Sequence, residues 1–107
     1  MNLYHYQAKV FNVVDGDTLD VTVDLGLRVT IEMRIRLYGV NTPERGQPNW
    51  AEATAMLTAL TLGQTVTAST VKPHDKYGRW LASIVTTDGV DVAQALIESG
   101  LGVPYFG

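Results

Sequence analysis

The segment from Arg36 to Glu44 combines residue types that suit phosphate-ester chemistry. The guanidinium of Arg36 is a planar fork that binds a phosphate through two hydrogen bonds. Asn41, Thr42 and Glu44 follow in a loop and offer an amide oxygen, backbone carbonyls and a carboxylate. Such oxygens are ligands for a hard metal ion, and a carboxylate can orient an attacking water. The segment therefore indicates a candidate site for phosphoryl chemistry.

A second candidate is Asp17, within Asp15-Gly16-Asp17-Thr18. Asp17 lies two residues before the apolar Leu19 and therefore on the same face of the predicted strand. Its carboxylate should point toward the apolar side. An inward carboxylate is costly unless a cation or several donors receive it.

Each segment also has a simpler interpretation, which the sequence leaves open. Asp17 would accept hydrogen bonds from the amides of its own turn. Arg36 would pair with Glu32 or Asp20 across a solvated sheet face, and Glu44 would lie in solvent.

A third polar segment, Asp-Lys-Tyr-Gly-Arg at residues 75–79, brings a second arginine, Arg79. Its alternative is a solvated hairpin turn. Tyr77, Trp80, Tyr105 and Phe106 are candidates for stacking on bases, although most aromatic residues in a small domain fill its core.

The elements that must position these residues follow from hydrophobic periodicity. Alternation of apolar and polar residues predicts half-buried strands, and apolar residues at helical spacing predict helices. We expect strands over Gln7–Val14, Thr18–Leu25, Arg28–Leu37, Val66–Val71 and Trp80–Thr86, and helices over Trp50–Leu62 and Val92–Ser99. On the third strand Val29, Ile31, Met33, Ile35 and Leu37 should form one apolar face.

Turn and capping signals separate these elements. Glycine and proline residues throughout Gly39–Pro48 predict a loop, and Asp88-Gly89 is a turn signal. Asn49 with Glu52, and Asp91 with Gln94, fit helix-capping patterns. The order predicts a mixed β-barrel with helices: a five-stranded barrel of the OB type, with a helix between strands three and four and a short C-terminal helix. A generic α+β sheet with two helices on one face is the alternative.

The chain has 107 residues, which suits one domain over residues 1–107. It has no cysteine, which excludes a disulfide scaffold and thiolate zinc sites. A net charge of −3 counts against a simple DNA-binding module, but less against an enzyme that recruits a divalent metal. Met1 to Tyr6 show no secretory signal, so we expect a protein that is cytoplasmic or released by other means.

Four motifs together resemble the staphylococcal nuclease (thermonuclease-like) family in order and approximate spacing. The resemblance covers about Val10 to Leu101. The motifs are Val14-Asp15-Gly16-Asp17-Thr18, Arg36 with Asn41-Thr42-Pro43-Glu44, Asp75-Lys76-Tyr77-Gly78-Arg79, and Ala95-Leu96-Ile97-Glu98-Ser99-Gly100-Leu101.

This resemblance implies an OB-type barrel and calcium-dependent hydrolysis of nucleic-acid phosphodiesters. It implies that Asp17, Asn41 and the Thr42 carbonyl hold the ion. Glu44 matches the residue that orients or deprotonates the attacking water. The remaining matches are Arg36 and Arg79 for the scissile phosphate, Lys76 and Tyr77 near a neighbouring phosphate, and Tyr105 for base stacking.

The sequence departs from the family pattern at Asn41, where the best-known members carry a second metal-binding aspartate, and it ends before their C-terminal helix. We therefore expect a calcium-dependent nuclease for single-stranded or frayed DNA, with RNA as a further candidate substrate and a monomer as the default. The rival hypothesis is a catalytically weak or inactive OB-fold module that binds nucleic acid or peptide.

Overall fold

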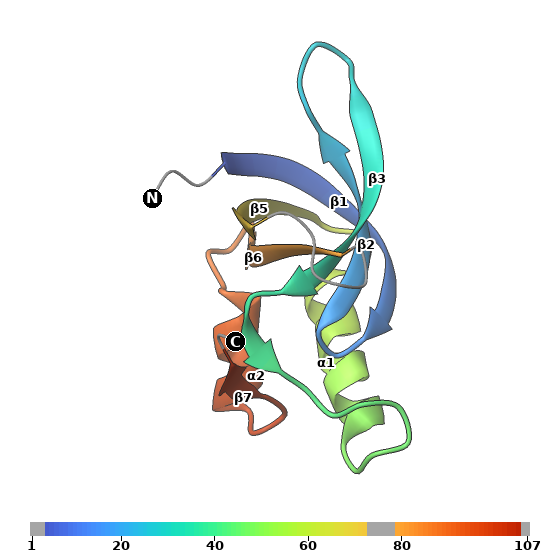
Figure 1. Cartoon of the computed structure of the whole chain (residues 1–107), viewed down its shortest axis with the longest axis vertical. Coiled ribbons are helices and arrows are strands. Elements are labelled where there is room, and N and C mark those ends of the chain that lie inside the picture. The colour runs from blue at the N-terminus through green and yellow to red at the C-terminus, as the bar shows by residue number, and fades with distance from the viewer. Residues whose placement is uncertain (1–3, 73–78, 106–107) are drawn as a thin grey trace.

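The computed structural model describes residues 4–72 and 79–105 (Figure 1). Within these residues, nine helices and strands follow one another. They are β1 (Tyr4–Asp15), β2 (Thr18–Asp24), β3 (Thr30–Leu37), β4 (Gly39–Asn41), α1 (Trp50–Thr61), β5 (Thr65–Lys72), β6 (Trp80–Thr86), α2 (Val92–Glu98) and β7 (Val103–Tyr105). In this part of the chain, no helix is both long and apolar enough to cross a membrane.

Five strands close into a barrel in the order β1-β2-β3-β6-β5. β3 and β6 pair in parallel, and the other pairs that close the barrel are antiparallel. Alternate side chains from these strands fill the interior, and both helices contribute to the same core. This confirms the predicted OB-type barrel, with α1 between the third and fourth barrel strands.

The two helices begin differently. Asp91 caps α2 as predicted, because its side chain accepts a hydrogen bond from the Gln94 N–H at 3.3 Å. The capping box predicted for α1 is wrong: Asn49 has a left-handed backbone, with φ of 69°, and its side chain makes no capping bond. With that backbone Asn49 lacks the extended conformation typical of a side-chain cap. Its backbone oxygen still accepts from the Ala53 N–H at 3.0 Å.

The predicted loop Gly39–Pro48 begins with a short strand that periodicity did not reveal. β4 pairs antiparallel with β7, so that Gly39 lies opposite Tyr105 and Asn41 opposite Val103. Three-residue strands are too short to show alternation, and these two are far apart in sequence. The pairing brings the C-terminal strand beside the end of β3.

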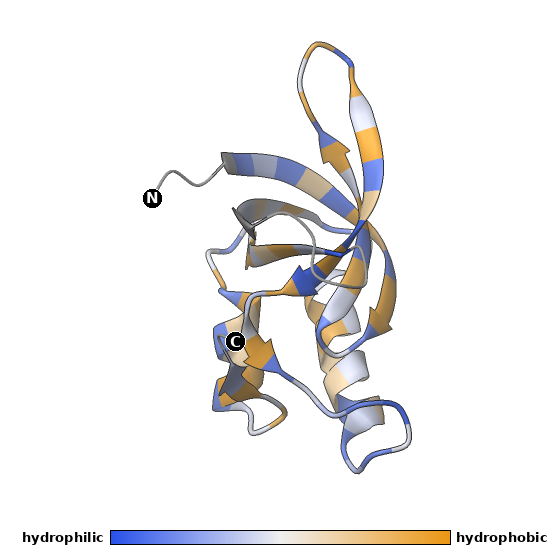
Figure 2. Ribbon diagram, in the orientation of Figure 1, coloured by the Kyte–Doolittle hydropathy of each residue, from blue (hydrophilic) through white to orange (hydrophobic). Residues whose placement is uncertain are grey.

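The β2–β3 hairpin projects beyond the rest of the barrel (Figure 1), and the apolar face predicted for β3 is only partly buried. Ile35 is buried, whereas Val29 and Ile31 are 49% and 40% exposed. Figure 2 shows apolar residues along this projecting hairpin. The prediction failed here because alternation identifies a strand but not how far the barrel covers it. At the tip, Leu27 and Arg28 both have positive φ, so the strand begins only at Thr30.

Candidate functional site

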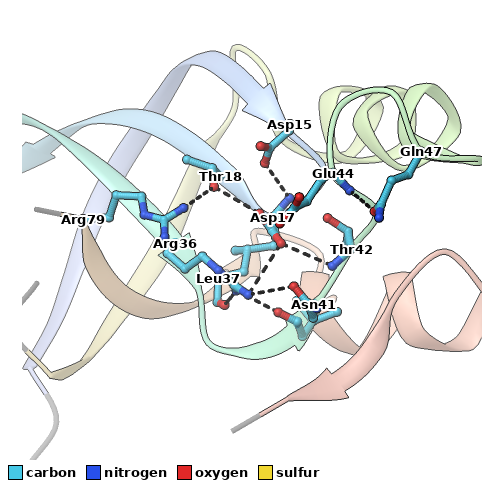
Figure 3. A network of polar contacts seen from close by, with 11 residues as sticks. Asp15, Asp17, Thr18, Arg36, Leu37, Asn41, Thr42, Glu44, Gln47 and Arg79 are labelled. Carbon is cyan, nitrogen blue, oxygen red and sulfur yellow. Dashed lines mark hydrogen bonds and ion pairs between the residues drawn. The ribbon is translucent and has the colours of Figure 1, made fainter. Parts of the chain in front are cut away.

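The candidate site forms where the β1–β2 turn, the end of β3 and the segment after β4 meet (Figure 3). Gly16 allows the turn to approach closely. A Cβ added there would lie 2.7 Å from Thr42 Oγ1 and 2.8 Å from Ala53 Cβ. A side chain at this position would therefore push the turn away from both Thr42 and α1.

Asp17 is buried, with 8% of its surface exposed, as its parity predicted. Its Oδ2 accepts a hydrogen bond from the Thr42 N–H at 3.2 Å, and its Oδ1 accepts from the Thr18 hydroxyl at 3.1 Å. The predicted alternative, acceptance from turn amides, describes Asp15 instead, whose Oδ1 accepts from the Asp17 N–H at 3.3 Å. Asp17 thus connects the turn to the segment that follows β4.

Arg36 is also buried, although it was expected on the polar face of its strand. Its Nη1 donates to the carbonyls of Leu37 and Val40, the latter at 2.7 Å. Its Nη2 donates to Asn41 Oδ1 at 3.3 Å and lies 3.6 Å from Asp17 Oδ2. The guanidinium is therefore fixed on one side by backbone and shared on the other between an amide and a carboxylate.

The surface pairing considered for Arg36 is wrong, because Asp20 pairs with Arg34. Arg34 Nε donates to Asp20 Oδ1 at 2.7 Å, and Asn12 donates to Oδ2 of the same carboxylate. The hydrogen bond from Arg34 is the main reason that the pKa of Asp20 lies below its ordinary value.

Two further contacts extend the site around the arginines. The Arg36 Cζ lies 5.9 Å from the ring centroid of Tyr105 on β7, within the range of a cation–π contact. Arg79, just before β6, donates from Nη1 to the Thr18 hydroxyl at 3.4 Å. Two segments from the C-terminal half of the chain therefore reach Arg36 and Thr18, the two side chains that contact the Asp17 carboxylate.

Glu44 lies in the exposed loop between β4 and α1. Its N–H donates to Gln47 Oε1 at 2.7 Å, and the Gln47 N–H donates back to the Glu44 carbonyl at 2.9 Å. This reciprocal pair fixes the turn that carries the carboxylate. Figure 3 shows the Glu44 side chain directed toward Asp15 and Asp17.

Asp15 is a half-buried carboxylate beside Asp17. Burial is the largest cause that raises the pKa of Asp15 above its ordinary value, and the adjacent Asp17 carboxylate raises it further. The two acids therefore repel each other when both are ionised.

The oxygen ligands available at this site are of the chemical types that a calcium ion takes. Asp17 supplies a carboxylate and Asn41 an amide oxygen, and the backbone carbonyl of Thr42 lies in the same segment. Among residues 4–72 and 79–105, the buried Thr42 Oγ1 has no hydrogen-bond partner. One polar oxygen at the site is therefore left to interact with a ligand. Hard cations take such oxygen ligands. Within the same ranges, no three His, Cys, Asp or Glu residues form a group that could hold a metal ion.

The structure thus brings five predicted residues close together or into one connected network, and Glu44 lies on the adjoining loop. The five are Asp17, Arg36, Asn41, Thr42 and Arg79. Tyr105 lies over Arg36, which was not predicted, while Lys76 and Tyr77 lie outside the described residues. Sequence reasoning assigned no role to Thr18 or Gln47. The only sequence signal for their roles was position: Thr18 follows Asp17 directly, and Gln47 lies three residues after Glu44.

Comparison with known proteins identifies relatives of this chain. Residues 34–106 match the family described as staphylococcal nuclease homologue. A protein of Shigella flexneri named "Micrococcal nuclease" is 39% identical over 108 residues, covering 94% of this chain and 59% of that protein. A protein of Escherichia coli O157:H7 named "Uncharacterized endonuclease" is 35% identical over 98 residues, covering 92% of this chain and 60% of that protein. The chain thus spans about 60% of the length of these relatives.

Proposed function

The chain belongs to the staphylococcal nuclease homologue family, and we propose that it is a calcium-dependent nuclease that hydrolyses phosphodiester bonds of single-stranded or frayed DNA, with RNA as a second substrate. The observation that carries this proposal is the connected network of one buried carboxylate and two arginines. Asp17 contacts Arg36 directly and Arg79 through Thr18.

The contacts of Arg36 indicate how it would receive a phosphate. Nη1 is anchored by the carbonyls of Leu37 and Val40, whereas the contacts of Nη2 to Asn41 and Asp17 are longer, at 3.3 and 3.6 Å. A phosphate oxygen would therefore replace the Nη2 contacts and leave the anchor intact. A guanidinium held in this way acts on charge that develops in the transition state without reorganising.

Arg79 would contact the same phosphate from the β6 side, because its guanidinium reaches Thr18 next to Asp17. Glu44, on the turn fixed by Gln47, would orient a water molecule and accept its proton. A calcium ion held by Asp17, Asn41 and the Thr42 carbonyl would supply Lewis-acid polarisation of a phosphate oxygen.

Tyr105 would stack on the base next to the phosphate. Its side chain is half exposed, and its ring lies over Arg36. Exposed aromatic rings stack on bases with little sequence preference. This position favours recognition of unpaired bases over an intact duplex.

The test is incubation with plasmid DNA, single-stranded DNA and single-stranded RNA, with calcium or with a chelator, from neutral to alkaline pH. The proposal expects degradation that requires calcium and is fastest on single strands. The Glu44→Gln variant controls for contaminating nucleases, because it should be nearly inactive. Binding of oligonucleotides without calcium-dependent cleavage would instead support the rival binding module, which Asn41 favours because it leaves the ion site with less charge.

A further inference from the structure

Thr18 lies between the carboxylate and one arginine of the site, and its side chain is 2% exposed. Its hydroxyl accepts from Arg79 Nη1 at 3.4 Å and donates to Asp17 Oδ1 at 3.1 Å (Figure 3). A guanidinium can only donate, and an ionised carboxylate can only accept. The single hydroxyl proton is therefore committed to Asp17, and the hydrogen bonds run from Arg79 through Thr18 to Asp17.

The barrel fixes the place of this hydroxyl. Thr18 is the first residue of β2 and lies opposite Arg36 on β3, while Arg36 lies opposite Leu81 on β6. Arg79 immediately precedes β6. The hydroxyl therefore lies where three neighbouring barrel strands meet the site, and it is held by strand pairing and not by a mobile loop.

The two oxygens of Asp17 consequently have different connections. Oδ2 faces Arg36 at 3.6 Å and accepts from the Thr42 N–H. Oδ1 is oriented by Thr18, and through it is connected with Arg79. Loss of the hydroxyl would free the rotation of the Asp17 carboxylate and remove an anchor from Arg79 in one step.

We propose that Thr18 is a positioning residue that couples the carboxylate of the ion site to the phosphate-binding guanidinium of Arg79. The proposal rests on the nuclease function proposed above and adds a residue to it. Through Asp17, Thr18 sets calcium affinity; through Arg79, it sets the rate once calcium is bound. Partners that orient a metal ligand typically change affinity or activity about 10- to 100-fold when they are removed.

The test compares Thr18→Val, which removes the hydroxyl at similar size, with Thr18→Ser, which keeps it. Thr61→Val is the matched control, because Thr61 is fully buried and its hydroxyl donates to the Leu57 carbonyl within α1. Calcium binding is measured by calorimetry without nucleic acid, and cleavage of single-stranded DNA is measured at saturating calcium. Each Thr18 substitution is made with Arg79 intact and in the Arg79→Ala background.

Thr18→Val should weaken calcium binding about 10-fold or more in both backgrounds. It should slow cleavage by a similar factor with Arg79 intact, but have little effect on the remaining rate in Arg79→Ala. Thr18→Ser should stay near the wild type, and Thr61→Val should change thermal stability without changing calcium affinity. Calcium affinity and rate that are unchanged in Thr18→Val, or changed equally by Thr61→Val, would overturn the proposal.

A measurement without calcium or substrate separates this proposal from the proposed function. Rotation of the Arg79 guanidinium, followed by nitrogen NMR, should be slower in the wild type than in Thr18→Val. If the wild-type chain cleaves nothing but shows this difference, the nuclease proposal fails and the coupling stands. If rotation is equally fast in both proteins, the coupling fails whatever the activity.

Discussion

Replacing Arg36 by methionine would separate the structural role of its charge from the catalytic one. Arg36 and Asp17 are an ion pair at 3.6 Å, with side chains only 10% and 11% exposed. Breaking a buried pair by removing one partner costs about 3–5 kcal/mol, because the other charge stays buried. Asp17 keeps its hydrogen bonds from Thr42 and Thr18, so we expect the lower end, about 3 kcal/mol. For a domain of this size that is a fall in Tm of roughly 12 °C or more.

Calcium should reverse much of this loss. The variant leaves Asp17 without its neighbouring cation, so a divalent ion should bind more tightly than in the wild type, where Arg36 repels it. Cleavage should nevertheless fall about 10²-fold or more, the scale for loss of a preorganised donor to developing charge. Arg36→Met should thus bind calcium better and cleave worse.

The matched control is Arg34→Met, which removes a cation from the same strand. Arg34 pairs with Asp20, but its side chain is 51% exposed. Pairs with an exposed partner contribute about 0–1 kcal/mol. The Asp20 side chain is 14% exposed but keeps its hydrogen bond from Asn12, so Arg34→Met should retain activity and most of its stability. Thermal unfolding with chelator and with calcium, together with cleavage rates, tests the comparison. If Arg36→Met is as stable as Arg34→Met in chelator, or gains no more from calcium than the wild type, the reasoning is refuted.

Three further predictions concern the acids and the amide of the site. Glu44→Gln should abolish most cleavage while calcium-dependent binding of an oligonucleotide survives, and equal loss of both would make Glu44 a ligand or a structural residue instead of the base. Asp15→Asn should raise Tm at neutral pH. The pKa of Asp15 is raised in the folded chain, so the wild type loses stability relative to the variant as pH rises from the ordinary aspartate pKa through the raised one. Thermal unfolding over a pH series measures this difference, and a gap that does not grow with pH in that window would contradict it. Asn41→Asp should tighten calcium binding without substrate and lower the calcium needed for half-maximal cleavage, and calorimetry that shows no gain would place residue 41 away from the ion.

The sequence was sufficient to predict the barrel because its strands have strong local signals. Alternation from Thr18 onward and again from Arg28 predicts the two strands of the β2–β3 hairpin without knowledge of the rest of the chain. The β6 boundaries agree fully with the prediction, Trp80–Thr86. By contrast, β4 and β7 pair across most of the chain, and no local pattern in a three-residue strand encodes such a partner.

For the candidate site, the sequence likewise predicted individual residues but not how they contact one another. Residue types identified Asp17 and Arg36 as candidates, each with a structural alternative, and the family resemblance grouped them with Arg79 in one predicted site. The connections between them were not predictable, since they depend on strand register. Thr18 joins Asp17 to Arg79 only because β3 pairs with both β2 and β6, so that the starts of these two strands lie on either side of Arg36.

The balance of charge at the site would reconcile an acidic chain with the nucleic-acid substrate proposed above. The site and its adjoining turn carry the acids Asp15, Asp17 and Glu44 and the bases Arg36 and Arg79, which leaves one formal negative charge in excess among these five residues. Without a metal ion, this balance opposes the approach of a phosphate. A divalent cation would reverse it to one positive charge, so that bound calcium would favour binding of the phosphate and the phosphate would in turn favour binding of calcium. Coupling between two ligands is reciprocal. With Asn41 in place of a second carboxylate, the proposed ion site has less negative charge of its own, so we expect calcium affinity to depend more strongly on bound substrate.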